Sequence, residues 1–279
     1  MTIQLGLVGE NISRSRAPRL HEYLGRLCGL DVRYARLDSE GIDRFDPLAV
    51  LQDCMDKGFR GLNVTHPFKR EVAAAIPNLR PRARRVGSVN TVVFVDGLWM
   101  GANTDYSGFI QGYRHTFGAM KAGCVLILGA GGVSRAISFA LAELDVDEIL
   151  VHDLDAERAA GLVAVLTENG LGARAVSADS VDAIAADVDG LINATPVGMF
   201  KHPGIPIPPD AIARQRWAFD AVYTPLHTEF LQRCEKAGVP VMTGFELFLY
   251  QGLDAFRCFT GITVEQDEVR PEVETWMDG

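Results

Sequence analysis

A glycine-rich turn between an apolar strand and a helix constrains the fold of this chain more than any other feature. The sequence GAGG at positions 129–132 follows the apolar run 124–128 and opens a helical pattern that continues to position 144. Glycines let the backbone turn tightly and approach a pyrophosphate, whose charge is stabilised by amides at a helix N-terminus. Because Ser134 stands in the third glycine position of GxGxxG, the pattern alone also fits a plain tight turn.

Alternating strands and helices continue after this turn. A strand at 148–153 and a helix at 156–169 follow, so the segment begins a βαβα arrangement that is typical of a parallel sheet. We therefore predict a dinucleotide-binding domain here. Its further predicted elements are strands at 190–194 and 217–221 and helices at 228–238 and 246–260.

An acidic residue, Asp153, stands at the end of the second strand of this domain. A carboxylate here can accept hydrogen bonds from the adenosine ribose of NAD, whereas the additional phosphate of NADP would meet negative charge and need a cation. Asp153 or Asp155 alternatively caps the helix that begins at Ala156, and Asp155 is the better capping candidate. Since no arginine is adjacent, the sequence favours NAD over NADP.

The first half of the chain also alternates strands with helices, which points to a second parallel sheet. The dipeptide Asp96-Gly97 separates two strand patterns and predicts a hairpin turn. A helix at 106–117 then bridges the two domains. The predicted strands are 3–9, 32–37, 61–65, 90–95 and 98–100, and the predicted helices are 18–27, 48–55 and the KREVAAA segment at 69–75.

Polar stretches at strand ends of the first half form the second candidate site, because parallel sheets expose those ends to ligands. They are 13–16, 63–69 and the NT pairs at 90–91 and 103–104. Oxidation of an alcohol needs a group that takes the hydroxyl proton. A lysine partly shielded from water and held by a carboxylate can do so, and Lys69 and Asp105 are the candidates. From spacing alone, each also fits a solvated surface charge.

Composition excludes several classes of function. The 27 Lys and Arg residues against 36 Asp and Glu give a net charge of −9, which disfavours nucleic acid or an anionic membrane as the partner. The apolar runs are too short for a membrane helix, and no apolar leader begins the chain, so a cytoplasmic protein is expected. The five cysteines form no CxxC pair, which argues against a zinc site or a disulfide framework. No metal is predicted.

A set of ordered motifs resembles the shikimate dehydrogenase family, which includes quinate/shikimate dehydrogenases. The motifs are GLNVTHPFK, GSVNT, GANTD, LGAGGVSRA, NATPVGM and VYTPLHT, followed by Gly244 and Gln251, and they cover roughly residues 6–261. The resemblance implies a two-domain α/β enzyme that reversibly oxidises shikimate to 3-dehydroshikimate with NAD. A discontinuous α/β substrate domain, 1–106 with 244–279, would flank a Rossmann domain at 107–243 with a doubly wound parallel sheet.

The resemblance also implies roles for particular residues. The catalytic lysine falls on Lys69 and its partner aspartate on Asp105. The implied substrate contacts are Ser15, Asn63, Thr65, Asn90, Tyr223 and Gln251. The nicotinamide side would be lined by Asn193, Thr195 and Gly244. With the glycine turn and its acidic partners, the remaining predicted cofactor contacts are Gly129, Ala130, Gly131, Gly132, Val133, Asp153 and Asp155.

Three positions depart from the family's usual pattern. Ala17 replaces the second hydroxyl residue of the loop implied to bind the substrate carboxylate, and losing that bond costs about 10- to 100-fold in affinity unless another group replaces it. The arginines at 14, 16 and 19 either compensate or are solvated. Leu154 stands where NADP-dependent members commonly carry a phosphate-binding arginine, which again favours NAD. Leu247 replaces a common methionine of similar volume.

Other functions remain compatible with the sequence. Quinate or aminoshikimate fits the same fold and chemistry, and the change at Ala17 leaves the natural cyclic polyhydroxy carboxylate open. A protein of another class, an NAD-binding sensor with weak catalysis, is also compatible, although the intact Lys69 and Asp105 argue against it. Both a monomer and a homodimer fit the resemblance.

Overall fold

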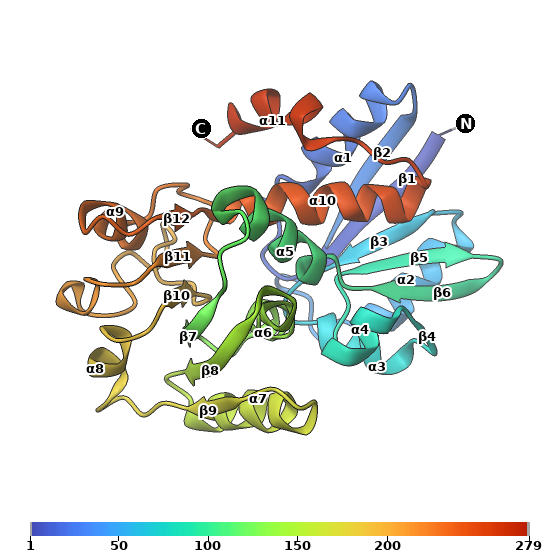
Figure 1. Cartoon of the computed structure of the whole chain (residues 1–279). Coiled ribbons are helices and arrows are strands. Elements are labelled where there is room, and N and C mark those ends of the chain that lie inside the picture. Colours follow the sequence, from blue (N-terminus) through green and yellow to red (C-terminus); the bar gives the residue numbers. More distant parts are fainter. Residues whose placement is uncertain (1, 278–279) are drawn as a thin grey trace. The chain divides into compact units, whose positions relative to one another are not determined.

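The computed structural model describes residues 2–277, which fall into two compact units, each built around its own six-stranded sheet (Figure 1). Of the described residues, one unit runs to Ser107 and resumes over Tyr250–Val273, and the other comprises Gly108–Leu249 and residues 274–277. The predicted substrate domain instead included all of 244–279, of which 278–279 lie outside the described residues, as does position 1. The assignment of functions to the two parts of the chain stays a prediction.

The sheet of the first unit mixes parallel and antiparallel pairs. Strands β2, β1 and β3 are parallel, whereas β3 with β5 and β5 with β6 are antiparallel. The expected parallel sheet is thus correct for only part of this unit, because β5 runs antiparallel to β3 and, through the hairpin at Asp96-Gly97, to β6. The sheet order is β2(Asp31–Asp38), β1(Thr2–Gly9), β3(Gly61–Val64), β5(Thr91–Val95), β6(Leu98–Ala102) and β4(Asn78–Leu79).

Helices α1(Ala17–Leu27) and α10(Gly244–Thr260) pack together in this unit. Gly252 of α10 lies so close to Leu20 of α1 that a Cβ on the glycine would come within 2.4 Å of that leucine. Leu20 and Leu24 recur at helical spacing and are completely buried. This apolar face explains why the segment forms helix α1. The other helices with residues in the unit are α2(Pro47–Asp56), α3(Lys69–Ala75), α4(Pro81–Val86), α5(Thr104–Phe117) and α11(Gln266–Glu274).

The sheet of the second unit is parallel throughout, as predicted. The central strand β7(Gly123–Leu128) lies between β8 and β10, so the strand order reverses direction beside it. Ligands of doubly wound sheets bind at this switch point, beyond the carboxyl ends of the strands. The sheet order is β12(Val241–Met242), β11(Trp217–Asp220), β10(Gly190–Asn193), β7, β8(Val146–His152) and β9(Ala173–Ala175).

Helix α6(Gly132–Leu141) follows β7 directly. It ends three residues earlier than predicted, because Ala142–Leu144 tightens into a 3-10 turn before Asp145, which adopts a left-handed conformation with φ of +54°. No helix within residues 2–277 is long and apolar enough to cross a membrane. The remaining helices of the unit are α7(Ala156–Glu168), α8(Val181–Ala185), the 3-10 turn Pro209–Ala211 and α9(Glu229–Lys236).

Candidate active site

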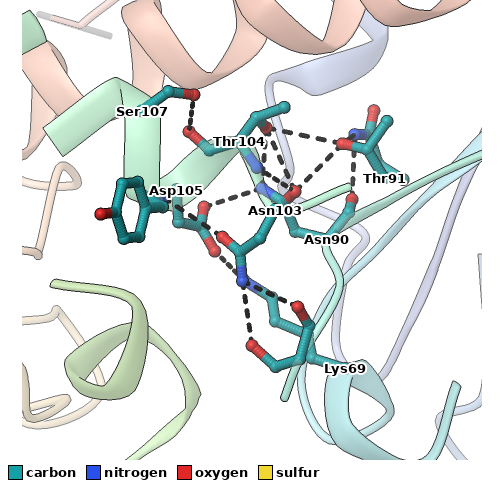
Figure 2. A network of polar contacts seen from close by, with 10 residues as sticks. Lys69, Asn90, Thr91, Asn103, Thr104, Asp105 and Ser107 are labelled. Carbon is teal, nitrogen blue, oxygen red and sulfur yellow. Dashed lines mark hydrogen bonds and ion pairs between the residues drawn. The ribbon is translucent and has the colours of Figure 1, made fainter. Parts of the chain in front are cut away.

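Lys69 and Asp105 form a shielded ion pair in the first unit (Figure 2). The Lys69 Nζ donates to Asp105 Oδ2 at 2.5 Å, and the two side chains are only 14% and 9% exposed. Lys69 is the first residue of α3, and Asp105 lies in the first turn of α5, where the helix dipole favours a negative charge. Lys69 and Asp105 are thus in contact and less exposed than ordinary surface charges, and their joint catalytic role stays a prediction.

Asn90 holds the other oxygen of the Asp105 carboxylate. Its Nδ2 donates to Asp105 Oδ1 and to Thr104 Oγ1, each at 2.9 Å, while its Oδ1 accepts from the backbone N–H of Thr104 at 2.7 Å (Figure 2). Both carboxylate oxygens thus accept a hydrogen bond, which suits an ionised group. The ammonium of Lys69 keeps further N–H donors for a ligand. Thr91 Oγ1 also donates to Asn90 Oδ1 at 3.0 Å and extends the network.

Asn63 lies at one end of the same network and is oriented by a buried tyrosine. Its Nδ2 donates to the Asn90 carbonyl and to Thr91 Oγ1, both at 3.1 Å, and its Oδ1 accepts from the Tyr34 hydroxyl at 2.7 Å. Tyr34 stacks on His21, with ring centroids 5.0 Å apart. Burial lowers the pKa of His21 to about 3, so this ring is neutral at physiological pH. The remaining hydrogen-bonding capacity of Asn63 is on its Oδ1, which accepts rather than donates.

The other predicted substrate residues lie on several separate elements. Ser15 lies on the loop before α1, where its Oγ accepts from the Ala17 N–H at 3.3 Å. Thr65 follows β3, and Gln251 is a half-buried residue of α10. These three belong to the first unit, whereas Tyr223 belongs to the second, where it stacks on Phe248 with centroids 5.3 Å apart.

The glycine turn of the second unit leaves backbone amides open at the N-terminus of α6. Gly131 is the N-cap residue in extended conformation, and no side chain among the described residues caps the helix. Gly129 has φ of +94°, and a Cβ there would come within 2.9 Å of the Ala194 carbonyl oxygen, so only glycine fits. The buried Ser134 Oγ has no hydrogen-bond partner within residues 2–277. Uncapped amides beside an open glycine turn fit a pyrophosphate.

Asp153 fastens this turn to the end of β8. Its Oδ2 accepts from the Ala130 N–H at 2.7 Å, and its Oδ1 accepts from the Asp155 N–H at 2.9 Å. An ionised carboxylate has about four acceptor positions, so two remain for a ribose diol. Asp155 is the N-cap of α7 and accepts hydrogen bonds from the N–H groups of Glu157 and Arg158. The capping role that the sequence predicts as an alternative for Asp155 is thus present. Its predicted cofactor contact remains a prediction.

Asn193 and Thr195 are joined by hydrogen bonds in the loop after β10. Thr195 donates through both its backbone N–H and its hydroxyl to Asn193 Oδ1, at 3.0 and 2.7 Å. Asn193 Nδ2 donates in turn to the Asp220 carboxylate at 2.9 Å. The close approach of Gly129 to Ala194 brings this loop beside the glycine turn. Gly244 begins α10, where a Cβ would come within 2.5 Å of the Val222 carbonyl oxygen.

Asp220 is a buried carboxyl that sequence reasoning missed. Burial raises its pKa to about 7, opposed by hydrogen bonds from the Thr228 hydroxyl, the Val222 N–H and the Asn193 amide. The buried thiol of Cys234, whose own pKa is raised by burial and then by the Asp220 charge, also faces this group. An acidic residue within the apolar strand pattern at 217–221 was the only sequence signal that could have identified it.

The raised pKa of Asp220 predicts a pH-dependent stability. The unfolded chain ionises this carboxyl near pH 4 and the folded chain near pH 7. The contribution of Asp220 to the free energy of unfolding therefore decreases as the pH rises from about 4 to about 7, by at most roughly 1.4 kcal/mol per pH unit. In Asp220→Asn this component is absent. Urea unfolding at pH 5, 6, 7 and 8 should show the variant gaining stability relative to the wild-type protein as pH rises. A constant difference would contradict the buried, protonatable carboxyl.

Further polar contacts surround Lys69. Tyr34 was missed, because it reads as an ordinary strand residue. Thr91 and Thr104 belong to the predicted polar stretches, but their hydrogen-bond partners become visible only in the fold. Asn103 supports the same region by donating to the Ser88 hydroxyl and carbonyl, at 2.9 and 3.1 Å. No group of three or more acidic, histidine or cysteine side chains within residues 2–277 is arranged to hold a metal ion.

Comparison with known families relates this site to a dehydrogenase family. Residues 7–92 match the family model described as the shikimate dehydrogenase substrate binding domain. A quinate/shikimate dehydrogenase (NAD(+)) of Corynebacterium glutamicum is 36% identical over 275 residues, which cover 96% of this chain and 97% of the relative. A shikimate dehydrogenase (NADP(+)) of Streptomyces avermitilis is 39% identical over 264 residues, covering 92% of this chain and 90% of the relative.

Solved structures give the same relationship. The quinate dehydrogenase from Corynebacterium glutamicum in complex with NAD has a TM-score of 0.92 at 34% identity, covering 98% of this chain and 99% of the other. The shikimate 5-dehydrogenase from Thermus thermophilus in complex with NADP(H) and shikimate has a TM-score of 0.80 at 32% identity, covering 95% and 96%. Similar proteins thus include both NAD and NADP enzymes.

Proposed function

Because the chain belongs to the shikimate dehydrogenase family, we propose that it oxidises a cyclic polyhydroxy carboxylic acid with NAD and catalyses the reverse reduction. Shikimate, converted to 3-dehydroshikimate, is the first candidate substrate, and quinate is the second because related proteins named quinate/shikimate dehydrogenase are NAD enzymes. The observation that carries the proposal is the shielded contact of 2.5 Å between Lys69 Nζ and Asp105 Oδ2. A small organic acid, rather than nucleic acid or a membrane, is the proposed partner, and a cytoplasmic location is proposed with it.

Lys69 transfers the hydroxyl proton in this proposal. In the reverse reduction the Lys69 ammonium gives a proton to the ketone oxygen as the carbon receives a hydride. In oxidation the neutral amine form of Lys69 takes the proton of the substrate hydroxyl and becomes the ammonium, while the carbon that bears the oxygen gives up a hydride and becomes a ketone. NAD, when bound, supplies the acceptor for that hydride. Asp105 holds Nζ in place through Oδ2, and Asn90 holds Asp105 through Oδ1. The lysine is therefore fixed before a substrate arrives.

The ring of the substrate would be held by polar groups of the first unit. We assign its hydroxyls to Asn63, Thr65, Asn90 and Gln251, and its carboxylate to Ser15. Asn63 Oδ1 would accept a hydrogen bond from a substrate hydroxyl, because both hydrogens of the Asn63 amide are already donated within the protein. Tyr223 is proposed as a further contact of the carboxylate.

The cofactor would be held by the second unit. The pyrophosphate fits the uncapped amides of residues 131–133, and the ribose diol fits the remaining acceptor positions of Asp153. Leu154 is 99% exposed and offers no positive charge to the additional phosphate of NADP, which supports the preference for NAD. Asn193, Thr195 and Gly244 are proposed to line the nicotinamide side.

Initial rates with a substrate panel test this function. Shikimate, quinate and 3-aminoshikimate-type analogues are each assayed at 340 nm with NAD and with NADP. The expected result is reduction of NAD by shikimate or quinate, with a lower kcat/KM for NADP. Binding of NAD without oxidation of any cyclic acid would instead support the sensor alternative and contradict the proposed enzyme. The preserved Lys69 and Asp105 pair favours catalysis over sensing.

A further inference from the structure

Hydrogen bonds hold the loop that precedes α1, in which Ser15 carries a hydroxyl and the nearby Ala17 does not. Asp38 accepts from the N–H groups of Asn11 and Ile12, each at 3.0 Å, and the Ser15 N–H donates to the Ile12 carbonyl at 2.9 Å. Ser15 Oγ accepts from the Ala17 N–H, so its own proton remains available to a ligand. Ala17 contributes no side-chain donor. Of these two positions, only Ser15 thus offers a hydroxyl to an anion.

A guanidinium from the neighbouring strand lies at this loop. Arg36 is a residue of β2, and its Nη2 donates to the Ser15 carbonyl oxygen at 2.9 Å. That contact uses one of the five N–H donors of the arginine and leaves the others for a ligand. Arg36 therefore brings a positive charge to the residue that supplies the remaining hydroxyl. Sequence reasoning had considered only the arginines at 14, 16 and 19.

The sheet register places Arg36 on the same face as Asn63. Strands β2, β1 and β3 lie side by side (Figure 1). Leu7 of β1 pairs with Arg36 on one side and with Asn63 on the other, so the three residues form one row across these strands. Side chains of one row point to the same face, and two strand spacings separate the outer residues by about 10 Å. A six-membered ring with its substituents suits this separation. Its hydroxyls can lie at Asn63 while its carboxylate lies towards Arg36.

The positive charge of Arg36 also acts on Tyr34, the hydrogen-bond partner of Asn63. Burial raises the pKa of the Tyr34 phenol well above its usual value, and the positive charge of Arg36 opposes this shift. Tyr34 is the residue whose hydroxyl donates to Asn63 Oδ1 at 2.7 Å. The guanidinium is thus close enough to the hydroxyl-binding residues to act on them.

We propose that Arg36 binds the carboxylate of the substrate together with the Ser15 hydroxyl, and so replaces the bond that Ala17 cannot make. This inference rests on the proposed function. Arg36 is then a specificity-determining residue that selects ring acids over uncharged cyclitols. Arginine suits this role because its planar fork matches the geometry of a carboxylate.

Substrates with and without a negative charge test the assignment. The kcat/KM values of the wild-type protein, Arg36→Met and Arg36→Lys are compared for shikimate, quinate and their methyl esters. Arg36→Met should lower kcat/KM for each acid that is oxidised by about 10- to 100-fold, the effect of losing one charged hydrogen bond. The same variant should change kcat/KM for the corresponding ester by less than about threefold, since the ester carries no charge to lose. Arg36→Lys should recover part of the activity on the acid.

A matched control lies on the same strand. Arg33 is exposed, pairs with Asp31 at 3.2 Å and points to the opposite face from Arg36, three residues away. Arg33→Met should leave kcat/KM for the acid unchanged. A second variant, Arg36→Met combined with Ala17→Thr, should regain activity on the acid because the new hydroxyl can bond the carboxylate.

The outcomes separate this inference from the proposed function. An equal loss for acid and ester in Arg36→Met would mean that Arg36 only fixes the Ser15 loop, and would overturn the inference while leaving the function intact. Unchanged kcat/KM for both would overturn it as well. A wild-type protein that oxidises none of these acids would overturn the proposed function, and the inference with it.

Discussion

Replacing Lys69 with alanine is expected to lower kcat for oxidation of the cyclic acid by about 100- to 10,000-fold, the usual effect of removing a proton-transfer group. Lys69 Nζ is held at 2.5 Å from Asp105 Oδ2, and no other lysine of residues 2–277 forms an ion pair of comparably low exposure. The dissociation constant of NAD should change little, because the glycine turn lies in the other unit. Steady-state rates and a fluorescence titration with NADH measure the two effects.

Two further variants separate chemistry from folding. Lys69→Ala leaves the shielded Asp105 carboxylate without its cation, which destabilises the folded protein. Lys69→Met combined with Asp105→Asn removes both charges, so it should fold more stably while losing about as much kcat as Lys69→Ala alone, since residues that act as a unit are not additive. Lys57→Ala is the control, because Lys57 forms an exposed pair with Asp53 at 2.6 Å. Turnover by Lys69→Ala within about threefold of the wild-type value would refute the proposed role.

Changing residues 153–155 to Asn-Arg-Thr is expected to shift the ratio of kcat/KM for NAD and NADP by at least about 100-fold towards NADP. Asparagine at position 153 keeps one acceptor oxygen but loses the negative charge that strengthens hydrogen bonds from the ribose diol. An arginine at position 154 supplies a cation for the phosphate, and each charged hydrogen bond is worth roughly 1.5–3 kcal/mol. The threonine that replaces Asp155 can still cap α7, because its hydroxyl also accepts from backbone N–H groups. The ratio is measured with saturating substrate and varied cofactor.

Leu154→Ala is the matched control for this change. It alters the same exposed position without adding charge, so the preference for NAD should persist. If the triple variant kept the wild-type ratio, Asp153 and Leu154 would not determine cofactor choice.

The second unit was the more predictable part of the fold. Strand β7, the glycine turn and α6 follow one another in the sequence, so one local pattern was enough to predict all three. The predicted parallel sheet of this unit was confirmed. Short elements were missed because two or three residues show no periodicity, as in β4, β9 and β12. Helix α11 was missed because it contains Pro271, which normally argues against a helix interior.

The first unit shows where local patterns were insufficient. The hairpin at Asp96-Gly97 was predicted from its turn residues, but its consequence, a sheet with antiparallel pairs beside parallel ones, was not. Alternation along the chain indicates which segments are strands, whereas the partner of each strand depends on contacts distant in sequence. The helix KREVAAA was confirmed with its predicted bounds, because its residues favour a helix locally.

The sequence predicted which residues belong to the candidate site better than it predicted the contacts between them. Lys69 and Asp105 were identified as a pair from chemistry and family resemblance, although 36 positions separate them. Tyr34 was missed because it resembles a core residue of a strand, and Asp220 was missed because it resembles a polar residue at the end of a strand. Arg36 was missed because its partner, the Ser15 carbonyl oxygen, belongs to the backbone and carries no sequence signal. Asp155 was predicted both as a cap and as a cofactor contact, and the structure gives it the cap.

A crystal structure of the protein with shikimate and NADH, a pair that cannot react with each other, tests the central claim most directly. The measured quantity is the distance from Lys69 Nζ to the hydroxyl oxygen at the carbon that is to be oxidised. Our account predicts about 2.6–3.2 Å, the reach of a group that exchanges a proton with that hydroxyl. A ring bound elsewhere, or a hydroxyl too far from Nζ for a direct or one-water contact, would contradict it.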